Sequence, residues 1–309
     1  MAEDEKKSTL LGLSINDIAD DMLIVFGEDA TKVQNRLIRL GYDIENINSS
    51  REFHTFNASN KDYSFPLIVA GLGSASVECV LSEIGMKRQE RVDQLTAGMK
   101  EAEAEKIDND YKINLYLAGT CGASKDYTLG ETVILTMGRI NNNGSSWFYQ
   151  SGRKRLFGPS AGLLKKANED LGMKVGNIFS SDAFYGFGCI LKDNQLEYSG
   201  APLNAEDTKH KGFEKFKELY NSKEPYLIDM ETAVFYMLCQ RLKGLEGIAI
   251  KGVSNFVPFD VDNAITHSNE RLALESSIDS CVKLIESSFM GREGARDYDS
   301  ADRSRNRIY

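Results

Sequence analysis

The chain is poor in the side chains from which metal and redox centres are built. It has three histidines, His54, His210 and His267, and their spacing matches no metal-binding motif. Its five cysteines stand singly, without a CxxC pair or a Cys/His cluster, at positions Cys79, Cys121, Cys189, Cys239 and Cys281. We therefore expect no metal site and no cofactor, and thiols that stay reduced, as they do in the cytoplasm.

Long apolar runs and linker-like segments are also missing. No stretch approaches the ~18 to 20 apolar residues that span a bilayer, and the charged residues 1–8 predict no targeting segment. No Pro/Gly/Ser-rich linker and no internal repeat divides the 309 residues, of which 41% are hydrophobic. These absences predict one globular domain, soluble and cytoplasmic, with enough apolar residues for a large core.

Basic residues are outnumbered by acidic ones. The chain has 37 Lys and Arg against 46 Asp and Glu, which gives a formal net charge of −9. This charge opposes non-specific attraction to nucleic acid and to an anionic membrane surface. We therefore expect neither as a partner, although a local basic pocket can still bind a small anion.

Strand and helix patterns alternate along the chain, which predicts an α/β protein. The apolar run 22–26 ends at Gly27, and a helix is expected over 29–40 because apolar residues recur there at helical spacing. The apolar run 65–70 likewise precedes a glycine turn and a helix. Further strands are expected at 52–58, 113–117, 132–137, 174–179 and 247–253, and further helices at 230–242 and 268–289.

The alternation covers residues 10–290, which we expect to form a single domain. Within it, residues 87–111 are rich in charge and in good helix formers, and they predict an exposed helix or a long connection. The final segment 291–309 is charged and almost free of large aliphatic residues, which predicts a disordered tail.

One glycine turn superficially resembles a dinucleotide-binding turn. Gly71-Leu72-Gly73 follows an apolar strand, as the first two glycines of a GxGxxG motif would. The third glycine would fall at Ser76, and no P-loop Gly-Lys-Ser/Thr is present. A Rossmann-type nucleotide-binding enzyme is therefore not supported.

Eight segments in order resemble the nucleoside phosphorylase family, and its uridine phosphorylase branch in particular. They are residues 11–18, Gly27 with Lys32-Val33, 50–53, 71–76, 119–123, 180–185, 228–233 and 252–255. The resemblance implies a single-domain, three-layer α/β/α fold with a central mixed, partly barrel-like sheet. It also implies phosphorolytic cleavage of the N-glycosidic bond of a nucleoside, which yields free base and (deoxy)ribose 1-phosphate in nucleoside salvage or catabolism.

The chemistry of this reaction explains the kinds of residue that the site needs. Breaking an N-glycosidic bond builds positive charge on the ribose in an oxocarbenium-like transition state. The resemblance places Glu231 at the ribose, where a carboxylate accepts hydrogen bonds from the 2′ and 3′ hydroxyls and suits the nascent cation. Met230 would pack against the sugar. The competing interpretations are that Glu231 is a helix N-terminal acid favoured by the macrodipole, and that Met230 fills the core.

The resemblance also implies residues that bind inorganic phosphate, the co-substrate. Gly27, Arg51 and Thr120 match their counterparts, and Arg51 would come from a neighbouring subunit, which implies a homo-oligomer, at least a dimer, with shared active sites. The chain departs from the family at two positions. Leu117 replaces a phosphate-binding arginine, and Lys32 replaces another arginine only after a one-residue shift. A lysine binds phosphate as a point charge and lacks the bidentate fork of arginine.

The expected base-binding residues differ more from the family. A Gln and an Arg that read uracil in uridine phosphorylases are absent, because residues 186–189 take their place. Gln150 and Arg153 are the candidates to supply an amide and a guanidinium from another loop, with a surface-loop role as the alternative. Phe184 is a candidate for stacking on the base, with a role in the core as the alternative.

Two further positions bear on substrate choice. Asn255 stands where purine phosphorylases and methylthioadenosine nucleosidases carry an aspartic acid that protonates the purine. An amide is no general acid, but it can hydrogen-bond a pyrimidine or a 6-oxo purine; the same change is also compatible with reduced activity. Leu10 replaces a histidine that contacts the 5′-hydroxyl in uridine phosphorylases, and an apolar residue there would tolerate or prefer a 5′-modified sugar.

Three functional hypotheses remain open at this point. The first is phosphorolysis of a nucleoside, with uridine as the first compound to test. The second is a nucleosidase in which water replaces phosphate, an alternative that Leu117 and the shifted Lys32 favour. The third is a catalytically silent relative that binds nucleosides.

Overall fold

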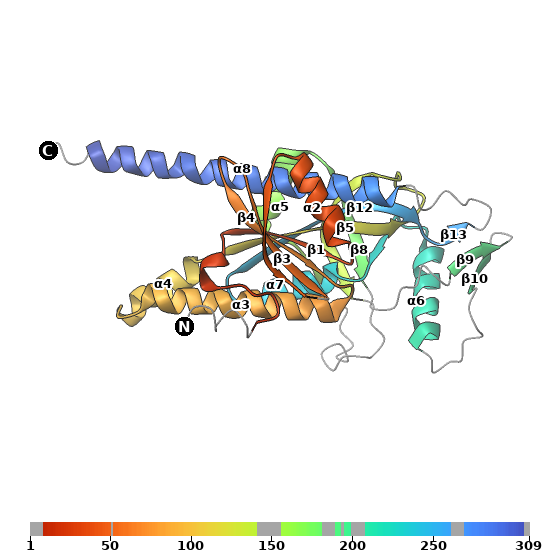
Figure 1. Ribbon diagram of the computed structural model, residues 1–309. Coiled ribbons are helices and arrows are strands. Elements are labelled where there is room, and N and C mark those ends of the chain that lie inside the picture. The colour runs from red at the N-terminus through yellow and green to blue at the C-terminus, as the bar shows by residue number, and fades with distance from the viewer. Residues whose placement is uncertain are drawn as a thin grey trace.

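A computed structural model describes residues 9–50, 52–140, 156–180, 189–192, 195–198, 208–260 and 269–305 (Figure 1). A large sheet forms the centre of this part of the chain, and helices lie on both of its faces. The predicted three-layer α/β/α architecture is thus confirmed. None of the helices in the described ranges combines the length and apolar character needed to cross a membrane.

The central sheet is mixed and closes on itself over part of its width. Its strands follow the order β11-β8-β6-β12-β5-β1-β4-β3-β2, and β7 pairs with β6. Since β11 pairs with both β8 and β5, strands β5, β12, β6, β8 and β11 form a closed ring. This ring is the partly barrel-like sheet that the resemblance implied. The strands are β1 (Asp21–Phe26), β2 (Asp43–Ser49), β3 (Phe53–Ser59), β4 (Ser64–Ala70), β5 (Ile113–Ala123), β6 (Thr132–Ile140), β7 (Leu156–Phe157), β8 (Lys174–Ser180), β11 (Leu227–Asp229) and β12 (Leu245–Phe256).

Two groups of helices cover the two faces of this sheet (Figure 1). On one face α3 and α7 pack against each other, and on the other face α8 packs on the sheet with α2 and α5 beside it. α4 packs against α3. The helices are η2 (Ile15–Asp17), α2 (Ala30–Arg39), α3 (Ser74–Thr96), α4 (Glu101–Asp110), α5 (Ala161–Leu171), α6 (Thr208–Ser222), α7 (Thr232–Arg241) and α8 (Glu270–Arg305). A separate small sheet joins β9 (Cys189–Lys192), β10 (Gln195–Tyr198) and β13 (Phe259–Asp260).

Strand β1 shows how the apolar sequence produces the layers. All of its residues are buried, because it lies between the parallel strands β4 and β5 with helices on both faces. Met22 and Ile24 belong to the core beneath α3 and α7, whereas Leu23 and Val25 belong to the core beneath α8. The strand thus leads the chain to Gly27 at its carboxyl end, the end at which α/β sheets bind ligands.

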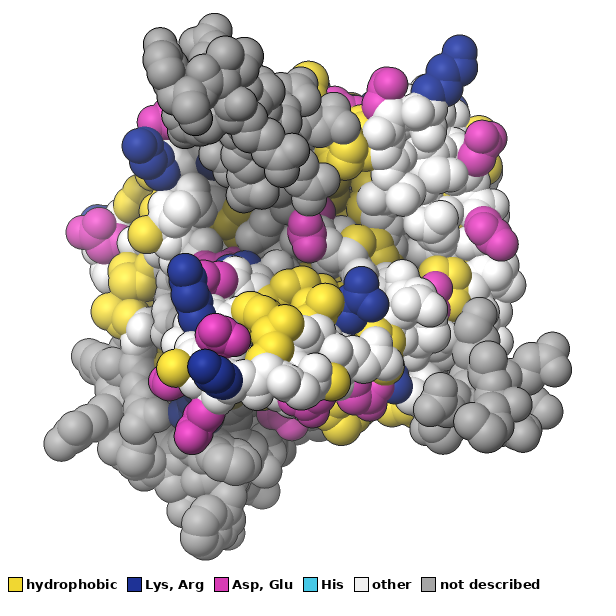
Figure 2. Space-filling model, turned by 90° about the vertical axis from the view of Figure 1, so that its left-hand side faces the viewer, with side chains coloured by type: hydrophobic (Ala, Val, Ile, Leu, Met, Phe, Trp, Pro, Cys, Tyr) yellow, Lys and Arg dark blue, Asp and Glu magenta, His cyan; other side chains and the backbone are white. Residues whose placement is uncertain are grey.

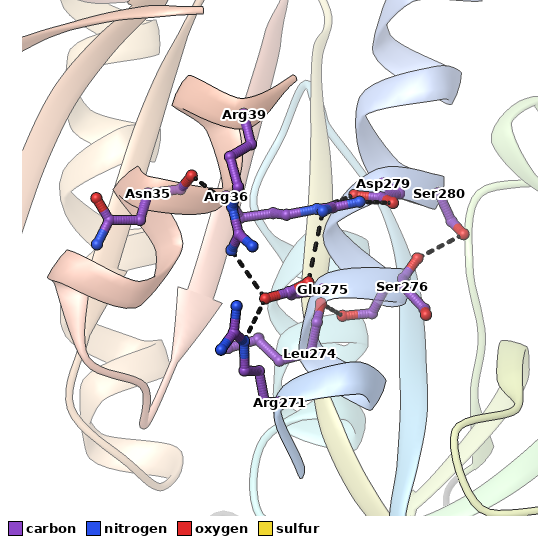
Figure 3. Close-up of polar contacts among 10 residues, drawn as sticks. Asn35, Arg36, Arg39, Arg271, Leu274, Glu275, Ser276, Asp279 and Ser280 are labelled. Atoms are coloured by element: carbon purple, nitrogen blue, oxygen red, sulfur yellow. Dashed lines mark hydrogen bonds and ion pairs between the residues drawn. The ribbon is translucent and has the colours of Figure 1, made fainter. Parts of the chain in front are cut away.

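A cluster of ion pairs ties α2 to α8 (Figure 3). Arg36 donates to both carboxylate oxygens of Asp279, with its Nε at 2.7 Å from Oδ1. Arg39 Nη2 donates to Glu275 Oε1 at 2.8 Å. Single exposed ion pairs contribute little to stability, but networks contribute more. Since α2 begins directly after the turn at Gly27, this network fixes that turn relative to α8.

Residues 87–111, expected to be an exposed helix or a long connection, form the end of α3 and the whole of α4. Arg88 of α3 is 1% exposed; it donates to the carbonyl of Tyr111 at 2.9 Å and pairs with Asp108. These bonds hold α4 against α3. Figure 2 shows the end of the molecule to which these helices extend, where hydrophobic side chains lie among acidic and basic ones.

The last helix is longer than the sequence predicts. α8 begins at Glu270 and runs to Arg305, so the helix end expected at residue 289 is wrong. Gly291 and Gly294 both lie inside the helix, because each glycine costs a helix only about 1 kcal/mol and Arg292, Glu293 and Ala295 beside them are good helix formers. The division of the chain at residue 290 stays a prediction.

A glycine in β12 sets the distance between the sheet and α8. A Cβ added to Gly252 would lie 2.1 Å from the carbonyl oxygen of Ala273 in α8. We expect Gly252→Ala to lower the free energy of unfolding by about 1–3 kcal/mol, because the helix must move away from the strand. The control is Gly162→Ala in α5, where no atom lies within 4 Å of the added Cβ. The control should stabilise the protein by about 0.5–1 kcal/mol. Urea unfolding measures both variants, and equal stability of the two would contradict the interpretation.

Candidate active site

Glu231 lies at the junction between β11 and α7. It is the residue before the first turn of α7, and it is only 3% exposed. Its side chain does not cap its own helix. Instead, its Oε1 accepts a hydrogen bond from the backbone N–H of Gly73 at 3.2 Å, and its Oε2 lies 3.6 Å from the Lys251 ammonium. Glu231 stands at the N-terminus of α7, so both interpretations of it, as a ribose-binding residue and as a helix N-terminal acid, stay predictions.

Asp229 caps α7 in its place. Its carboxylate accepts hydrogen bonds from the backbone N–H and the hydroxyl of Thr232. Ser180 Oγ donates to Asp229 Oδ1 at 2.5 Å and accepts from the backbone N–H of Ala233 at 2.9 Å. These bonds join the end of β8 to the start of α7, so they fix the backbone that carries Glu231.

Lys251 of β12 is a member of this cluster that the sequence analysis missed. It is 1% exposed, and its Nζ lies 3.5 Å from Asp229 Oδ2 and 3.6 Å from Glu231 Oε2. Lys251 pairs in register with Gly119 of β5, and a Cβ on that glycine would lie 2.8 Å from Nζ. A charged residue within an otherwise apolar strand was the available signal, since a buried charge requires a partner.

Opposing effects act on the ionisation of this pair. Burial raises the pKa of Glu231, the positive charge of Lys251 lowers it, and the charge of Asp229 raises it again. Burial by itself would lower the pKa of Lys251, but the two carboxylates hold it above its ordinary value. The lysine is therefore a cation at neutral pH, and the Glu231 carboxylate has a positive charge directly beside it.

Glu28 is a second residue that the sequence analysis missed. It directly follows the Gly27 turn, and its Oε1 accepts a long hydrogen bond from Thr120 Oγ1 at 3.5 Å. Burial and the charge of Glu270 raise the pKa of Glu28 to about 7, although the cations Lys32 and Lys251 and the Thr120 hydroxyl lower it. The carboxyl group therefore changes its charge near neutral pH.

The described residues of the expected phosphate site gather around Glu28. Thr120 bonds to it, and Lys32 is exposed and close enough to lower the pKa of Glu28. Gly27 has a positive φ of 73°, and its N–H donates to the carbonyl of Ala70 at 2.8 Å. Leu117, which stands where the family carries an arginine, is fully buried in the core.

Several expected site residues lie outside the described part of the chain. These are the phosphate-site residue Arg51 and the base-site residues Gln150, Arg153 and Phe184. Their roles stay predictions.

The structure also describes Met230, Asn255 and Leu10, the remaining residues with an expected role. Met230 is half-buried beside Glu231, and its N–H helps to lower the pKa of that carboxyl. Asn255 follows an irregularity in the pairing of β12 with β5. Its Oδ1 accepts a hydrogen bond from Ser254 Oγ at 2.8 Å, which leaves the amide fixed near the end of the strand. Leu10 is 53% exposed, so its apolar side chain is available for contact.

The described residues include no group of three His, Cys, Asp or Glu side chains that fits a metal ion. Four of the cysteines are free thiols: Cys79 is exposed, and Cys121, Cys239 and Cys281 are buried. Burial raises the pKa of the Cys121 thiol next to the cluster, which makes it a poor nucleophile at neutral pH.

Known proteins match part of this sequence and almost the whole of its fold. No protein-family model matches the chain. A purine nucleoside phosphorylase of the DeoD type from Clostridium novyi (strain NT) is 42% identical over 80 residues, which are 23% of this chain and span 33% of that relative. The crystal structure of uridine phosphorylase from Vibrio fischeri ES114 matches with a TM-score of 0.63 at 19% identity, over 92% of this chain and 99% of that one.

The chain has the nucleoside phosphorylase fold. The resemblance predicted from the eight sequence segments is confirmed with it. This fold is shared by the futalosine hydrolase of Helicobacter pylori strain 26695, which matches with a TM-score of 0.58 at 13% identity, over 89% of this chain and 100% of that one. The nucleoside phosphorylase fold therefore carries both a phosphorylase and a hydrolase among the proteins that resemble this chain.

Ser180 connects the Asp229 carboxylate to the backbone N–H of Ala233 in α7. Removing its hydroxyl should therefore lower the stability of the protein. We expect Ser180→Ala to lower the free energy of unfolding by about 1–3 kcal/mol, because a buried carboxylate and a buried N–H lose their partner. The control is Ser222→Ala, whose exposed hydroxyl donates to the carbonyl of Leu219 at 2.7 Å. That surface change should stay within about 0.5 kcal/mol of the wild type. Denaturant unfolding compares the two, and an unaffected Ser180→Ala variant would show that the cluster does not depend on this hydroxyl.

Proposed function

We propose that this chain is an enzyme that cleaves the N-glycosidic bond of a nucleoside. The observation that carries the proposal is the buried Glu231 carboxylate, held between the Gly73 amide and the Lys251 ammonium. A fixed negative charge at this place stabilises the cation that forms on the ribose. The names of two relatives, a purine nucleoside phosphorylase and a uridine phosphorylase, support the same reaction class.

The proposed roles follow the chemistry of the side chains. Glu231 binds the 2′ and 3′ hydroxyls of the ribose, and Met230 packs against the sugar. Asn255 donates or accepts a hydrogen bond at the base. Phe184 stacks on the base, with Gln150 and Arg153 as its polar partners. A uridine-like nucleoside is the first substrate to test, and the exposed apolar Leu10 favours a sugar modified at the 5′ position.

For the nucleophile we propose inorganic phosphate, with ribose 1-phosphate as the product. Thr120 and Lys32 lie beside Glu28, next to the Gly27 turn. With a pKa of about 7, Glu28 is partly protonated at neutral pH and can then donate a hydrogen bond to a phosphate oxygen. Arg51 of a neighbouring subunit would complete the site, so a homo-oligomer with shared sites and a cytoplasmic location belong to the proposal.

Water is the second candidate for the nucleophile. A carboxylate with a pKa near 7 is well matched to act as a general base on water. In addition, the Gly27 N–H is bonded to Ala70, and Leu117 supplies no guanidinium. These observations favour a nucleosidase, in which Glu28 would take the proton of the attacking water.

A nucleoside panel incubated with and without phosphate tests the reaction. We expect base release that requires phosphate and forms ribose 1-phosphate. Glu231→Gln should lower kcat/KM by about 100- to 1000-fold, because it removes a charge that stabilises the transition state. Glu169→Gln is the matched control, since that side chain is 64% exposed on α5. Phosphate-independent release would exclude obligatory phosphorolysis. If no nucleoside is cleaved while Glu231→Ala changes binding without changing any rate, the chain is a binding protein.

The dependence of the rate on pH separates the two nucleophiles. The pKa of Glu28 is raised to about 7, so the group gains its charge as pH rises from 6 to 8. If the reaction is phosphorolysis, the ratio of the wild-type rate to the rate of the Glu28→Gln variant should fall over that range, because the carboxylate then repels phosphate. Hydrolysis should accelerate instead, and Glu28→Gln should slow it by about 100- to 10,000-fold. The ionisation of phosphate itself is common to both proteins and cancels in the ratio of their rates. A ratio that is constant with pH would show that Glu28 takes part in neither reaction.

A further inference from the structure

We infer that Lys251 is a positioning residue that keeps the Glu231 carboxylate charged and in place for the ribose hydroxyls. This role rests on the proposed function, because it names the group that prepares Glu231 for the substrate. None of the motifs in the sequence contains Lys251. The inference depends on its place in the folded chain.

Lys251 is buried, so its ammonium interacts with other protein groups and not with solvent. The residue is 1% exposed, and its Nζ lies between two carboxylate oxygens at 3.5 Å and 3.6 Å. Taking a charge out of water is costly, and the cost is offset only by partners of opposite charge. Asp229 and Glu231 are these partners, and each of them is almost completely buried.

The charges around Lys251 distinguish this role from phosphate binding. From the β11–α7 junction it faces Asp229 and Glu231, from β5 the neutral thiol of Cys121, and from the β1–α2 turn Glu28. One ammonium between two carboxylates leaves the cluster with a net charge of −1. Such a cluster attracts a cationic ribose and repels phosphate, so Lys251 does not take the place of the arginine missing at Leu117.

Asp229 and Glu231 receive different support from their surroundings. Asp229 also accepts hydrogen bonds from Ser180 and Thr232, which stabilise its negative charge. Among the described residues, Glu231 has the backbone N–H groups of Gly73 and Met230 besides the lysine. Glu231 is therefore the carboxylate that depends more on Lys251.

Gly119 provides the space for the ammonium. Gly119 of β5 pairs in register with Lys251 of β12, and a Cβ on Gly119 would lie 2.8 Å from the lysine Nζ. The glycine of the Gly119-Thr120 segment thus has a role in addition to its place beside Thr120. It lets the lysine reach across the strand to the two carboxylates.

The first test measures stability against pH and needs no substrate. In Lys251→Met, Glu231 keeps its burial but loses its cation, so its pKa in the folded protein rises further above the unfolded value. Stability is then greatest at low pH and is lost as pH rises. We expect the melting temperature of Lys251→Met to fall relative to wild type by about 3 °C or more between pH 5 and pH 8. The double variant Glu231→Gln with Lys251→Met should lose most of this dependence.

The control for this test is Lys174→Met. Lys174 also lies in a strand, and its Nζ lies 3.5 Å from Glu131, but its side chain is 44% exposed. Its melting temperature should follow the wild type at every pH. If the double variant keeps the pH-dependent loss, Lys251 serves Asp229 and the inference is wrong. If Lys251→Met does not fold, the double variant should recover folding, and its failure to do so would equally overturn the inference.

The second test uses the enzymatic reaction. Glu231 must be ionised to act, so the acid limb of kcat/KM should move up by about one pH unit or more in Lys251→Met. Lys251→Arg, which keeps the charge, should restore the position of the limb at least in part. An unchanged acid limb in Lys251→Met would contradict the role of the lysine while leaving the proposed reaction intact. If the wild type cleaves no nucleoside, the proposed function fails, and the stability test still decides the role of Lys251.

Discussion

The ion pair that Lys251 forms with Asp229 and Glu231 is the interaction on which the site depends. Three charged side chains are buried together, an arrangement that is stable only if every charge has a partner. The partners come from β11, the start of α7 and β12. The closed ring of strands brings them together, because β11 pairs back onto β5 and β5 lies beside β12.

The fold, and the position of Glu231 and Met230 in it, could be predicted from the sequence to a large extent. Hydrophobic periodicity is a local property, and it indicated the strands and helices that build the three layers. The order of short motifs indicated Glu231 and Met230, and the structure places both at the junction where β11 meets α7. The end of α8 was predicted wrongly, because isolated glycines such as Gly291 and Gly294 are weak stop signals in a helix.

The charges that tune the site could not be predicted in the same way. Lys251 meets its partners through the register between β12 and β5, and Glu28 acquires its raised pKa through burial and through the approach of Glu270 at the start of α8. Both effects join segments that are far apart in the sequence. Neither leaves a motif, and only a lone charge in an apolar strand or next to a glycine turn indicates where to look.

Glu28 and Glu231 are held in place by separate sets of contacts, one of which is the ion-pair network between α2 and α8. Arg36 and Asp279 hold the turn that carries Glu28, whereas Ser180 and Asp229 hold the junction that carries Glu231. Changes on the α2–α8 side can therefore alter the surroundings of Glu28 and leave those of Glu231 intact. Under the proposed function, separate supports would let one architecture exchange phosphate for water over evolutionary time while the residues proposed to bind the ribose stay in place.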